Sequence, residues 1–290
     1  MPHDATALPD HLLRLQSRDG ARIAVSVFGG QICSWQTADG IERLFVSSRA
    51  RWDNCQAIRG GVPIIFPQFG AAGTGPRHGF ARTLPWTLLA SFIDDNDHAV
   101  MQLRLTDSTA SRQFSDAVFS LTLALRFAAG ALHISLEIDN TGTAPLSFCA
   151  ALHTYLRTEI PTASIHGLQH VTYRDATDGG DMKVDHESAL IVDREIDRVY
   201  RQARPNLVLR SDAGIIDVSQ TGFTDTVVWN PWIDKTRALL DCAPSDYLEF
   251  ICIEAALADR AHVLLPGQQW RGTQSLVISN KFQPAQGVSA

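Results

Sequence analysis

The sequence predicts an all-β fold made of many short strands. Three observations support this prediction. Apolar and polar residues alternate with a period of two in several segments, turn-forming residues separate these segments, and helical periodicity is scarce along the 290 residues. Because successive side chains of a strand point to opposite faces, this alternation is typical of strands that bury one face. A β sandwich or barrel is the architecture that such strands form.

The clearest strands cover residues 119–127 and 132–138. In both segments, Phe, Leu and Ile alternate with smaller or polar residues. Gly130 lies in the short segment between them and favours a turn. We therefore expect two strands joined by a short turn, each with one apolar face. Residues 140–142 (NTG) end the run.

The remaining strand candidates are shorter and are bounded by turn signals. In chain order they are residues 22–28, 86–93, 100–105, 207–209, 215–218, 226–229, 248–254 and 275–279. At most, residues 254–262 form a short helical turn. Residues 175–185 (DATDGGDMKVD) are polar and contain glycine, so they predict a surface loop that could border a binding site.

Nothing in the sequence divides the chain into parts. It has no internal repeat, no block of like charges and no linker rich in proline or serine. We expect a single domain over residues 1–290, with a core at about 12–282 and loose termini. The tail after Lys281 is the clearest of these loose ends.

The composition indicates a chain that can bury a sizeable core. Hydrophobic residues make up 45% and charged residues 19%, which argues against disorder. The formal net charge is −6, so nothing global favours nucleic acid or a membrane surface as a partner. An anionic small-molecule substrate would need a local group of arginines, because the overall field would not attract it.

The cysteines and the apolar runs predict a cytoplasmic location. Five cysteines occur without a CxxC pair, mostly among apolar residues, which favours buried free thiols in a reducing compartment over disulfides. The start, MPHDATALPDHLL, lacks the basic and apolar regions of a signal peptide. No apolar run approaches the roughly 18 residues of a membrane span. With no evident apolar patch, we expect a monomer.

Arginines gather in two segments that interrupt the usual pattern of polar surface and apolar interior. Residues 58–67 (IRGGVPIIFP) place Arg59 beside two glycines, and residues 77–82 (RHGFAR) contain His78 and Arg82. Glycine lets the backbone approach a ligand closely, and arginine offers a planar charged fork for phosphate or carboxylate. These segments predict an anion pocket. The alternative is that the arginines pair with acidic side chains or lie on the surface.

Two titratable residues stand in apolar surroundings. His153 lies in a strand-like run with apolar neighbours, and Glu254 would end the apolar face of the strand at 248–254. A partly buried histidine can act as acid or base near neutral pH. A carboxylate on an apolar face is costly unless it is compensated or functional. The plainer interpretations are a satisfied core histidine and a carboxylate that emerges into water.

Other segments carry weaker signals. Residues 225–232 (DTVVWNPW) place Asp225 near Trp229, a combination that suits sugar binding and also ordinary packing. Phosphate-loop, dinucleotide-binding, nucleophile-elbow and HExxH motifs are absent from the sequence. His166 and His170 are four residues apart, but Gly167 disfavours the helix that a metal-binding pair would need. We therefore expect no metal.

Five short blocks stand out when these segments are taken together. They begin at Ile58 (IRGGVP), His78 (HGFAR), His153 (HTYLR), Asp225 (DTVVWNPW) and Ile251 (ICIE). In this order they resemble the hexose-6-phosphate mutarotase branch of the aldose 1-epimerase family. The resemblance extends over roughly residues 22–278, nearly the whole chain.

The resemblance implies a galactose-mutarotase-like β supersandwich with the site on a concave sheet face. It also implies that Glu254 is the general base and His153 the general acid of an epimerase. The implied reaction interconverts the α and β anomers of a hexose 6-phosphate, with glucose 6-phosphate expected first. Ring opening takes a proton from the C1 hydroxyl and delivers one to the ring oxygen. No electron or group is transferred, so no cofactor is expected.

The same resemblance assigns binding residues and leaves alternatives open. Arg59 and Arg82 match a phosphate pocket, and His78 and Asp225 match positions expected to touch the sugar. One alternative is an epimerase of unphosphorylated sugars, which the arginines disfavour. A second is a carbohydrate-binding module without turnover, which would not need both an acid and a base. Glycoside hydrolysis or elimination is a third, and hydrolysis usually requires two carboxylates with distinct roles.

Overall fold

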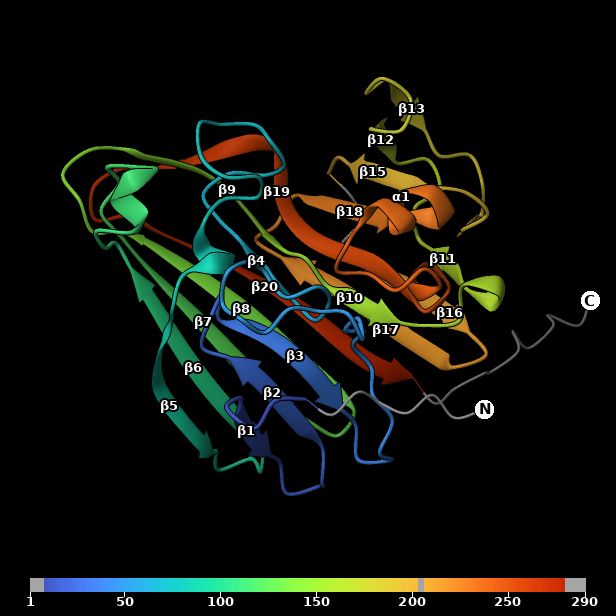
Figure 1. The fold of residues 1–290 in the computed structure, drawn as a ribbon, viewed down its shortest axis with the longest axis horizontal. Helices are drawn as coiled ribbons and strands as arrows, with labels where there is room; N and C mark the ends of the chain where they lie inside the picture. Colours follow the sequence, from blue (N-terminus) through green and yellow to red (C-terminus); the bar gives the residue numbers. More distant parts are fainter. Residues whose placement is uncertain (1–7, 203–205, 280–290) are drawn as a thin grey trace, which may run out of the picture.

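The computed structural model describes residues 8–202 and 206–279, and within these ranges the fold is nearly all β (Figure 1). Two large antiparallel sheets enclose a common core, and a small third sheet packs against it. The prediction of an all-β fold is confirmed. In the described ranges, α1 (Trp232–Ala238) is the single α-helix. None of the helices found there has the length and apolar character needed to span a bilayer.

The larger sheet has nine strands in the described part of the chain. Their order is β14 (Ala189–Ile191), β11 (Ser164–His166), β16 (Asn206–Ser211), β17 (Gly214–Thr221), β20 (Gln269–Ser279), β8 (Ala131–Asn140), β7 (Phe119–Ala128), β6 (Ala99–Thr106) and β5 (Thr87–Ile93). Buried and partly exposed residues alternate strictly along β7. The predicted pair of strands is therefore confirmed as the hairpin β7–β8.

The second sheet carries several of the predicted site residues. Its order is β13 (Met182–Val184), β12 (Thr172–Asp175), β15 (Ile196–Tyr200), β18 (Asp225–Asn230), β19 (Phe250–Leu264), β9 (Leu146–Leu152) and β4 (Ile64–Ile65), and β10 (Tyr155–Arg157) also pairs with β19. On β19, Ile253 and Ala255 face the core between the sheets. Cys252 and Ala256 pack in separate clusters, so Glu254, which lies between them, also faces away from that core.

The third sheet joins β1 (Leu13–Gln16), β2 (Arg22–Ser26) and β3 (Gln31–Gln36). Apolar residues of β2 and β3 belong to the same buried cluster as the leucines of β7 and β8. This cluster reaches from Ala21 to Leu276, so most of the described chain shares one core. Four short 3₁₀ helices complete the elements, namely η1 (Ala81–Thr83), η2 (Ser111–Gln113), η3 (Ile160–Thr162) and η4 (Asp246–Leu248).

Two local predictions are wrong. Residues 254–262 are not a helical turn but the middle of β19, which starts at Phe250 rather than at Leu248. Because β19 is buried on both faces near Glu254, its sequence reads as a continuous apolar run, which does not distinguish a strand from a helix. Residues 175–185 are not only a loop, since they contain the end of β12 and all of β13.

Candidate active site

His153 and Glu254 lie face to face on the second sheet. The β9–β19 ladder ends at Leu152, opposite Ala255, and the β10–β19 ladder resumes at Tyr155, opposite Cys252. The two ladders share one register, which sets His153 directly opposite Glu254. His153 Nε2 lies 3.4 Å from Glu254 Oε1. Two residues far apart in the sequence thus bring an imidazole and a carboxyl group together.

The pair sits at the floor of the site and is shielded from water. Glu254 is 1% and His153 8% exposed. His153 Nδ1 and Glu254 Oε2 are buried and make no hydrogen bond to any group in residues 8–202 and 206–279. Two polar atoms are therefore left without a protein partner at the point where a substrate hydroxyl or ring oxygen could be bound.

Burial disfavours the charged form of both residues. It raises the pKa of Glu254 well above its ordinary value, and the carboxylate of Asp197 raises it further, while Arg82 opposes the shift. Burial lowers the pKa of His153 well below its ordinary value, and the nearby cations Arg82 and Arg59 add to this effect. Burial therefore penalises the ionised form of each residue, in opposite directions of pKa.

Aromatic rings form a wall beside the pair. The ring of Tyr155 stacks on His153 at a centroid distance of 4.9 Å and an angle of 11°. Trp229, on β18, meets the edge of His153 at 5.9 Å and is half-buried. An imidazole held between two rings has little freedom to turn. The partly open face of Trp229 suits a sugar.

Arg59 and Arg82 are bound differently by the protein. Arg59 lies 3.2 Å from Asp241 and donates from Nη1 to Tyr155 Oη at 3.1 Å. Arg82 donates from Nη2 to the Arg77 carbonyl, and it takes part in none of the ion pairs found in residues 8–202 and 206–279. Burial, reinforced by Arg59 and Arg77, lowers the pKa of Arg82 to about 10. An added anion would therefore stabilise the charge of Arg82 more than that of Arg59, which Asp241 already offsets.

Glycines hold the two arginine segments against the sheets. Gly61 has φ +62°, and a Cβ there would lie 2.0 Å from the carbonyl oxygen of Ile32. Gly79 has φ +71°, and a Cβ there would lie 2.0 Å from the carbonyl oxygen of Phe66. These contacts exclude a side chain at either position. They explain why glycines accompany the arginines in both motifs.

His78 is a neutral member of the site. Its ring lies 5.7 Å from the ring of His153, and its Nδ1 accepts a hydrogen bond from the Gly70 N–H at 3.3 Å. Burial and the neighbouring Arg82 and Arg77 lower its pKa to about 3. Because Nδ1 is an acceptor, the proton of the neutral ring is on Nε2, which leaves His78 as a hydrogen-bond donor.

Asp225 lies on the site face of β18 but is held by the backbone. Its Oδ2 accepts hydrogen bonds from the N–H groups of Ala258 and Asp259, both at 2.9 Å, and the residue is 4% exposed. The two amides belong to the part of β19 where the register shifts, between Leu257 and His262. Asp225 therefore lies on the same face of the sheet as Glu254, and its two hydrogen bonds stabilise the irregular part of β19.

Comparison with known proteins identifies the family. The model of the family described as aldose 1-epimerase matches residues 11–277. The chain belongs to the aldose 1-epimerase family. It is 32% identical to a protein of Cenchrus ciliaris over 87% of this chain and 80% of that protein, and 31% identical to one of Escherichia coli K12 over 87% and 85%. Both relatives are provisionally named glucose-6-phosphate 1-epimerase.

Solved structures of the family confirm the predicted supersandwich. A protein from Salmonella typhimurium, provisionally called a mutarotase, superposes with a TM-score of 0.86 at 26% identity, covering 93% of this chain and 90% of that one. Galactose 1-epimerase from Lactobacillus acidophilus has a TM-score of 0.73 at 15% identity, covering 94% and 96%. The second similarity concerns the fold alone.

Sequence reasoning missed two residues of this candidate site. Tyr155 stacks on the imidazole of His153 and its hydroxyl accepts a hydrogen bond from Arg59. It lies two positions after His153, so strand alternation could have placed it on the same face. Asp197, opposite Trp229 on β15, raises the pKa of Glu254. No motif marks Asp197 in the sequence, because its place depends on pairing between β15 and β18.

The same cluster has the geometry to hold a metal ion. One donor atom each from His153, Cys252 and Glu254 lies within 4.8 Å of the other two. Burial raises the pKa of the Cys252 thiol well above its ordinary value, and Arg59 and Arg82 would repel a dication. These charges disfavour a dication in this cluster. His166 lies in β11, which rules out the helix considered for its pairing with His170.

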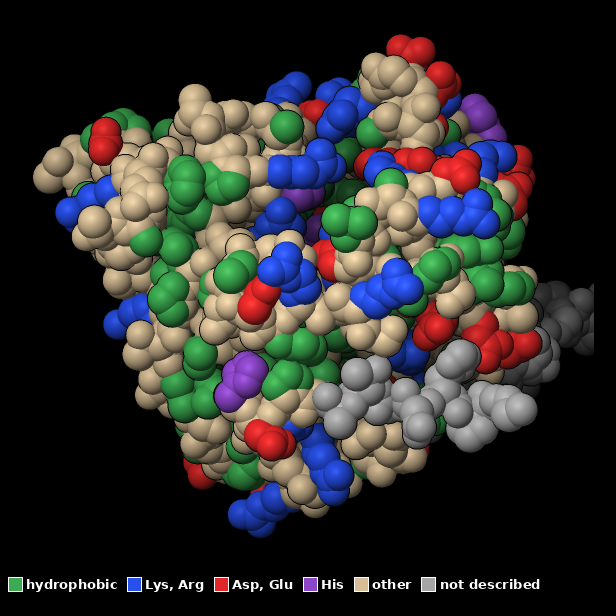
Figure 2. Space-filling view, in the orientation of Figure 1, with side chains coloured by type: hydrophobic (Ala, Val, Ile, Leu, Met, Phe, Trp, Pro, Cys, Tyr) green, Lys and Arg blue, Asp and Glu red, His purple; other side chains and the backbone are tan. Residues whose placement is uncertain are grey.

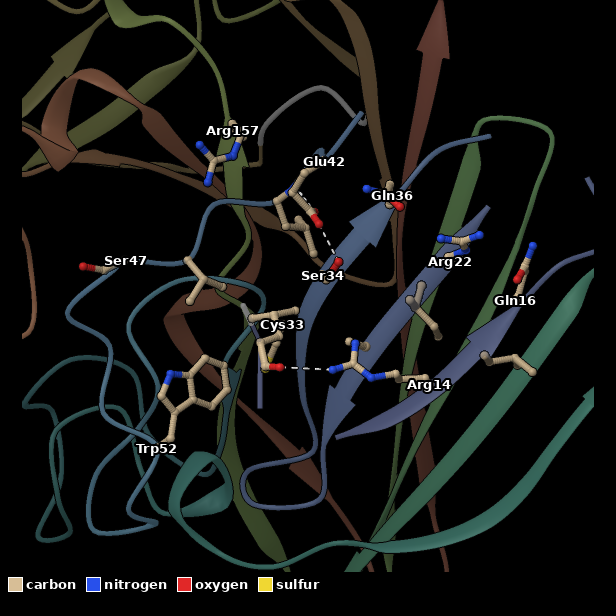
Figure 3. Close-up of a pocket in the computed structure, with 16 residues that line it drawn as sticks. Arg14, Gln16, Arg22, Cys33, Ser34, Gln36, Glu42, Ser47, Trp52 and Arg157 are labelled. Atoms are coloured by element: carbon tan, nitrogen blue, oxygen red, sulfur yellow. Dashed lines mark hydrogen bonds between the residues drawn. The ribbon is translucent and has the colours of Figure 1, made fainter. Parts of the chain in front are cut away.

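A large cavity of about 610 Å³ lies elsewhere, over the three-stranded sheet (Figure 3). Its lining includes Arg14, Arg22 and Arg157 but none of the predicted site residues. Arg157, which lines this cavity, pairs with Glu249. Figure 2 instead shows a hollow near the centre of the drawn face, with arginine or lysine (blue) and histidine (purple) side chains at its edge.

Proposed function

We propose that this isomerase interconverts the α and β anomers of a hexose 6-phosphate, with glucose 6-phosphate as the first substrate to test. One observation carries the proposal: His153 Nε2 and Glu254 Oε1 lie 3.4 Å apart in a buried site near the guanidinium of Arg82, which forms no ion pair within the part of the chain that the structure describes. An acid, a base and an anion-binding group are the three parts that this reaction on this substrate needs. The names of the two relatives above support the choice of substrate.

The chemistry follows from the pair. Glu254 takes the proton of the C1 hydroxyl while His153 donates a proton to the ring oxygen, and the C1–O5 bond breaks. The aldehyde rotates about C1–C2, and the ring closes with the two roles reversed. The hydroxyl oxygen and the ring oxygen are both bonded to C1, so the acid and the base must be close together. The 3.4 Å separation meets this requirement.

The phosphate prepares the pair for this chemistry. Arg82 and Arg59 lower the pKa of His153. A phosphate dianion bound to these arginines offsets their positive charge, so the imidazolium becomes less unfavourable once substrate is bound. His78 Nε2–H and the face of Trp229 are placed to hold the sugar, and Asp225 is a further candidate contact. The binding groups thus also help to charge the acid.

The alternatives can be separated by measurement. The test is the anomerisation rate of freshly dissolved α-glucose 6-phosphate, followed by NMR exchange or a coupled β-specific dehydrogenase. We expect wild type to exceed buffer, and Glu254→Gln and His153→Asn each to lose about 10²–10⁴-fold in kcat. A wild type no faster than buffer, on galactose and mannose 6-phosphates as well, would favour a binding module. Equal kcat/KM on glucose and glucose 6-phosphate would favour an epimerase of unphosphorylated sugars.

We further propose that the chain acts as a single-domain, cytoplasmic monomer with the sugar phosphate as its partner. The shared core from Ala21 to Leu276 supports one domain. All five cysteines are free, as predicted, although Cys55 is exposed and Cys149 only partly buried. Free thiols are typical of a reducing compartment.

A further inference from the structure

A glutamine from the opposite sheet reaches the strands that carry the catalytic pair. Gln274, on β20, is 0% exposed and lies in the core between the two large sheets. Its direct neighbours across the ladder are Ile134 on β8 and Gln220 on β17. A buried amide in such a core is costly unless both of its ends are hydrogen-bonded.

Both ends of Gln274 bind backbone or side-chain groups next to the pair. Its Nε2 donates to the carbonyl oxygen of Ile253 at 2.9 Å, and its Oε1 accepts from Thr154 Oγ1 at 2.5 Å. The Ile253 N–H donates in turn to the Thr154 carbonyl at 3.1 Å. Ile253 precedes Glu254 and Thr154 follows His153. A closed ring of three hydrogen bonds therefore ties the two catalytic positions together.

This ring of hydrogen bonds lies where the pairing of β19 with β9 and β10 is interrupted. The paired strands stop at Leu152 and resume at Tyr155, so His153 and Thr154 lie outside the regular ladder. His153 has one backbone hydrogen bond, to the Pro63 carbonyl at 3.1 Å, on the side away from β19. The spacing between His153 and Glu254 thus depends on the neighbours that Gln274 holds.

We infer that Gln274 is a positioning residue of the epimerase, which sets the spacing of His153 and Glu254 through Thr154 and Ile253. The inference rests on the proposed function. Gln274 touches neither substrate nor the reacting side chains, so it acts through the backbone. Removing it should lower kcat and leave KM nearly unchanged, because the arginines that bind phosphate lie on other segments.

The chain offers a matched control in Gln220. It is 8% exposed, lies directly opposite Gln274 and makes the same kinds of bonds to β18. Its Nε2 donates to the Asp225 carbonyl at 3.0 Å, and its Oε1 accepts from Thr226 Oγ1 at 3.3 Å. Gln220→Leu therefore removes a similar buried amide without freeing the ring at the catalytic pair.

The experiment compares Gln274→Leu with Gln220→Leu in thermal stability, kcat, KM and the pH profile of kcat. We expect both to lose stability, but Gln274→Leu to lose about 10- to 100-fold in kcat, the range that a displacement of about 1 Å can cause. KM should stay within about 3-fold. A wider spacing also weakens the attraction between carboxylate and imidazolium. The pH range over which kcat is high should therefore become narrower at both its acid and its alkaline end.

Substitution at Thr154 gives an independent test if Gln274→Leu does not fold. Thr154→Val removes the donated hydrogen bond at nearly constant shape and should lower kcat, whereas Thr154→Ser keeps the hydroxyl and should restore it. Equal kcat in Gln274→Leu and Gln220→Leu, or in Thr154→Val and Thr154→Ser, would overturn the inference. An inactive wild type would instead overturn the proposed function.

Discussion

At the scale of single residues, Arg59 and Arg82 differ in the protein groups that bind them. Arg59 is already neutralised by Asp241 and braced by Tyr155, whereas Arg82 is bound by one backbone carbonyl. The sequence could predict that both residues are candidates for an anion pocket, because each stands in a short block that also contains glycine. It could not predict which one is free, since Asp241 lies 182 residues from Arg59 along the chain.

This difference predicts different outcomes for two equal substitutions. Arg82→Met should raise KM for glucose 6-phosphate by about 10-fold or more, lower kcat less, and leave the melting temperature nearly unchanged. Arg59→Met should also lower the free energy of unfolding by about 1–3 kcal/mol, because it leaves the buried Asp241 without its partner. Steady-state kinetics and urea unfolding check both. Arg157→Met, outside the site, serves as the control, and an unchanged KM in Arg82→Met would contradict the assignment.

His78 predicts a pH dependence of stability. Its pKa of about 3 in the folded state lies below the 6.5 of the unfolded chain, so the unfolded state binds the extra proton. The stability that this residue contributes is complete above pH 6.5 and is lost as pH falls toward 3. Between pH 7 and pH 5, His78→Gln should therefore lose about 2 kcal/mol less than wild type in urea unfolding. Parallel losses in the two proteins would show that His78 is not held neutral.

At the scale of elements, β19 carries the site because it is central, long and bent. Figure 1 shows it arching over the end of the second sheet. The core of this strand was predictable from its apolar run, but its length was not, because alternation fails where both faces are buried. The break between β9 and β10, where His153 lies opposite Glu254, has no sequence signal. It becomes visible only when Leu152 and Tyr155 are found in one register.

The bend of β19 predicts a structural role for Asp225. Asp225→Ala removes both hydrogen bonds to the amides of Ala258 and Asp259 and should lower the free energy of unfolding by about 3 kcal/mol. Asp225→Asn keeps an acceptor oxygen and should cost much less. Urea unfolding and KM measured on both variants separate this role from sugar binding. A large rise in KM for Asp225→Asn at unchanged stability would show that the free carboxylate oxygen binds the substrate.

At the scale of the whole molecule, the all-β architecture was predictable from the sequence, but several short elements were not. The strand predicted at 119–127 was found within one residue of its observed ends, and the strand predicted at 132–138 within two. Short strands such as β13 and β14 were missed, because three residues do not carry a period. The helix α1 was missed for a similar reason. The predictions for the tail after Lys281 lie outside the described residues.

The shared core predicts one cooperative transition. If the two large sheets unfold together, the urea curves from tryptophan fluorescence and from far-ultraviolet circular dichroism should coincide. Trp35, Trp86 and Trp270 lie in the common core and report on it. Gln274→Leu is a useful companion, since it weakens a contact between the sheets. Two separate transitions in wild type would show that the chain contains more than one folding unit.

The way the site is assembled also bears on how such a protein can change over evolutionary time. His153 comes from the β9–β10 junction and Glu254 from β19. The arginines come from segments between β3 and β5, where Gly61 and Gly79 pack closely against the backbone of Ile32 and Phe66. The two parts are joined by the hydrogen bond from Arg59 to Tyr155 and by backbone hydrogen bonds from His153 to Pro63 and from Tyr155 to Gly61. A lineage that changes the arginines but keeps these backbone bonds would therefore alter the groups offered to an anion without moving His153 or Glu254.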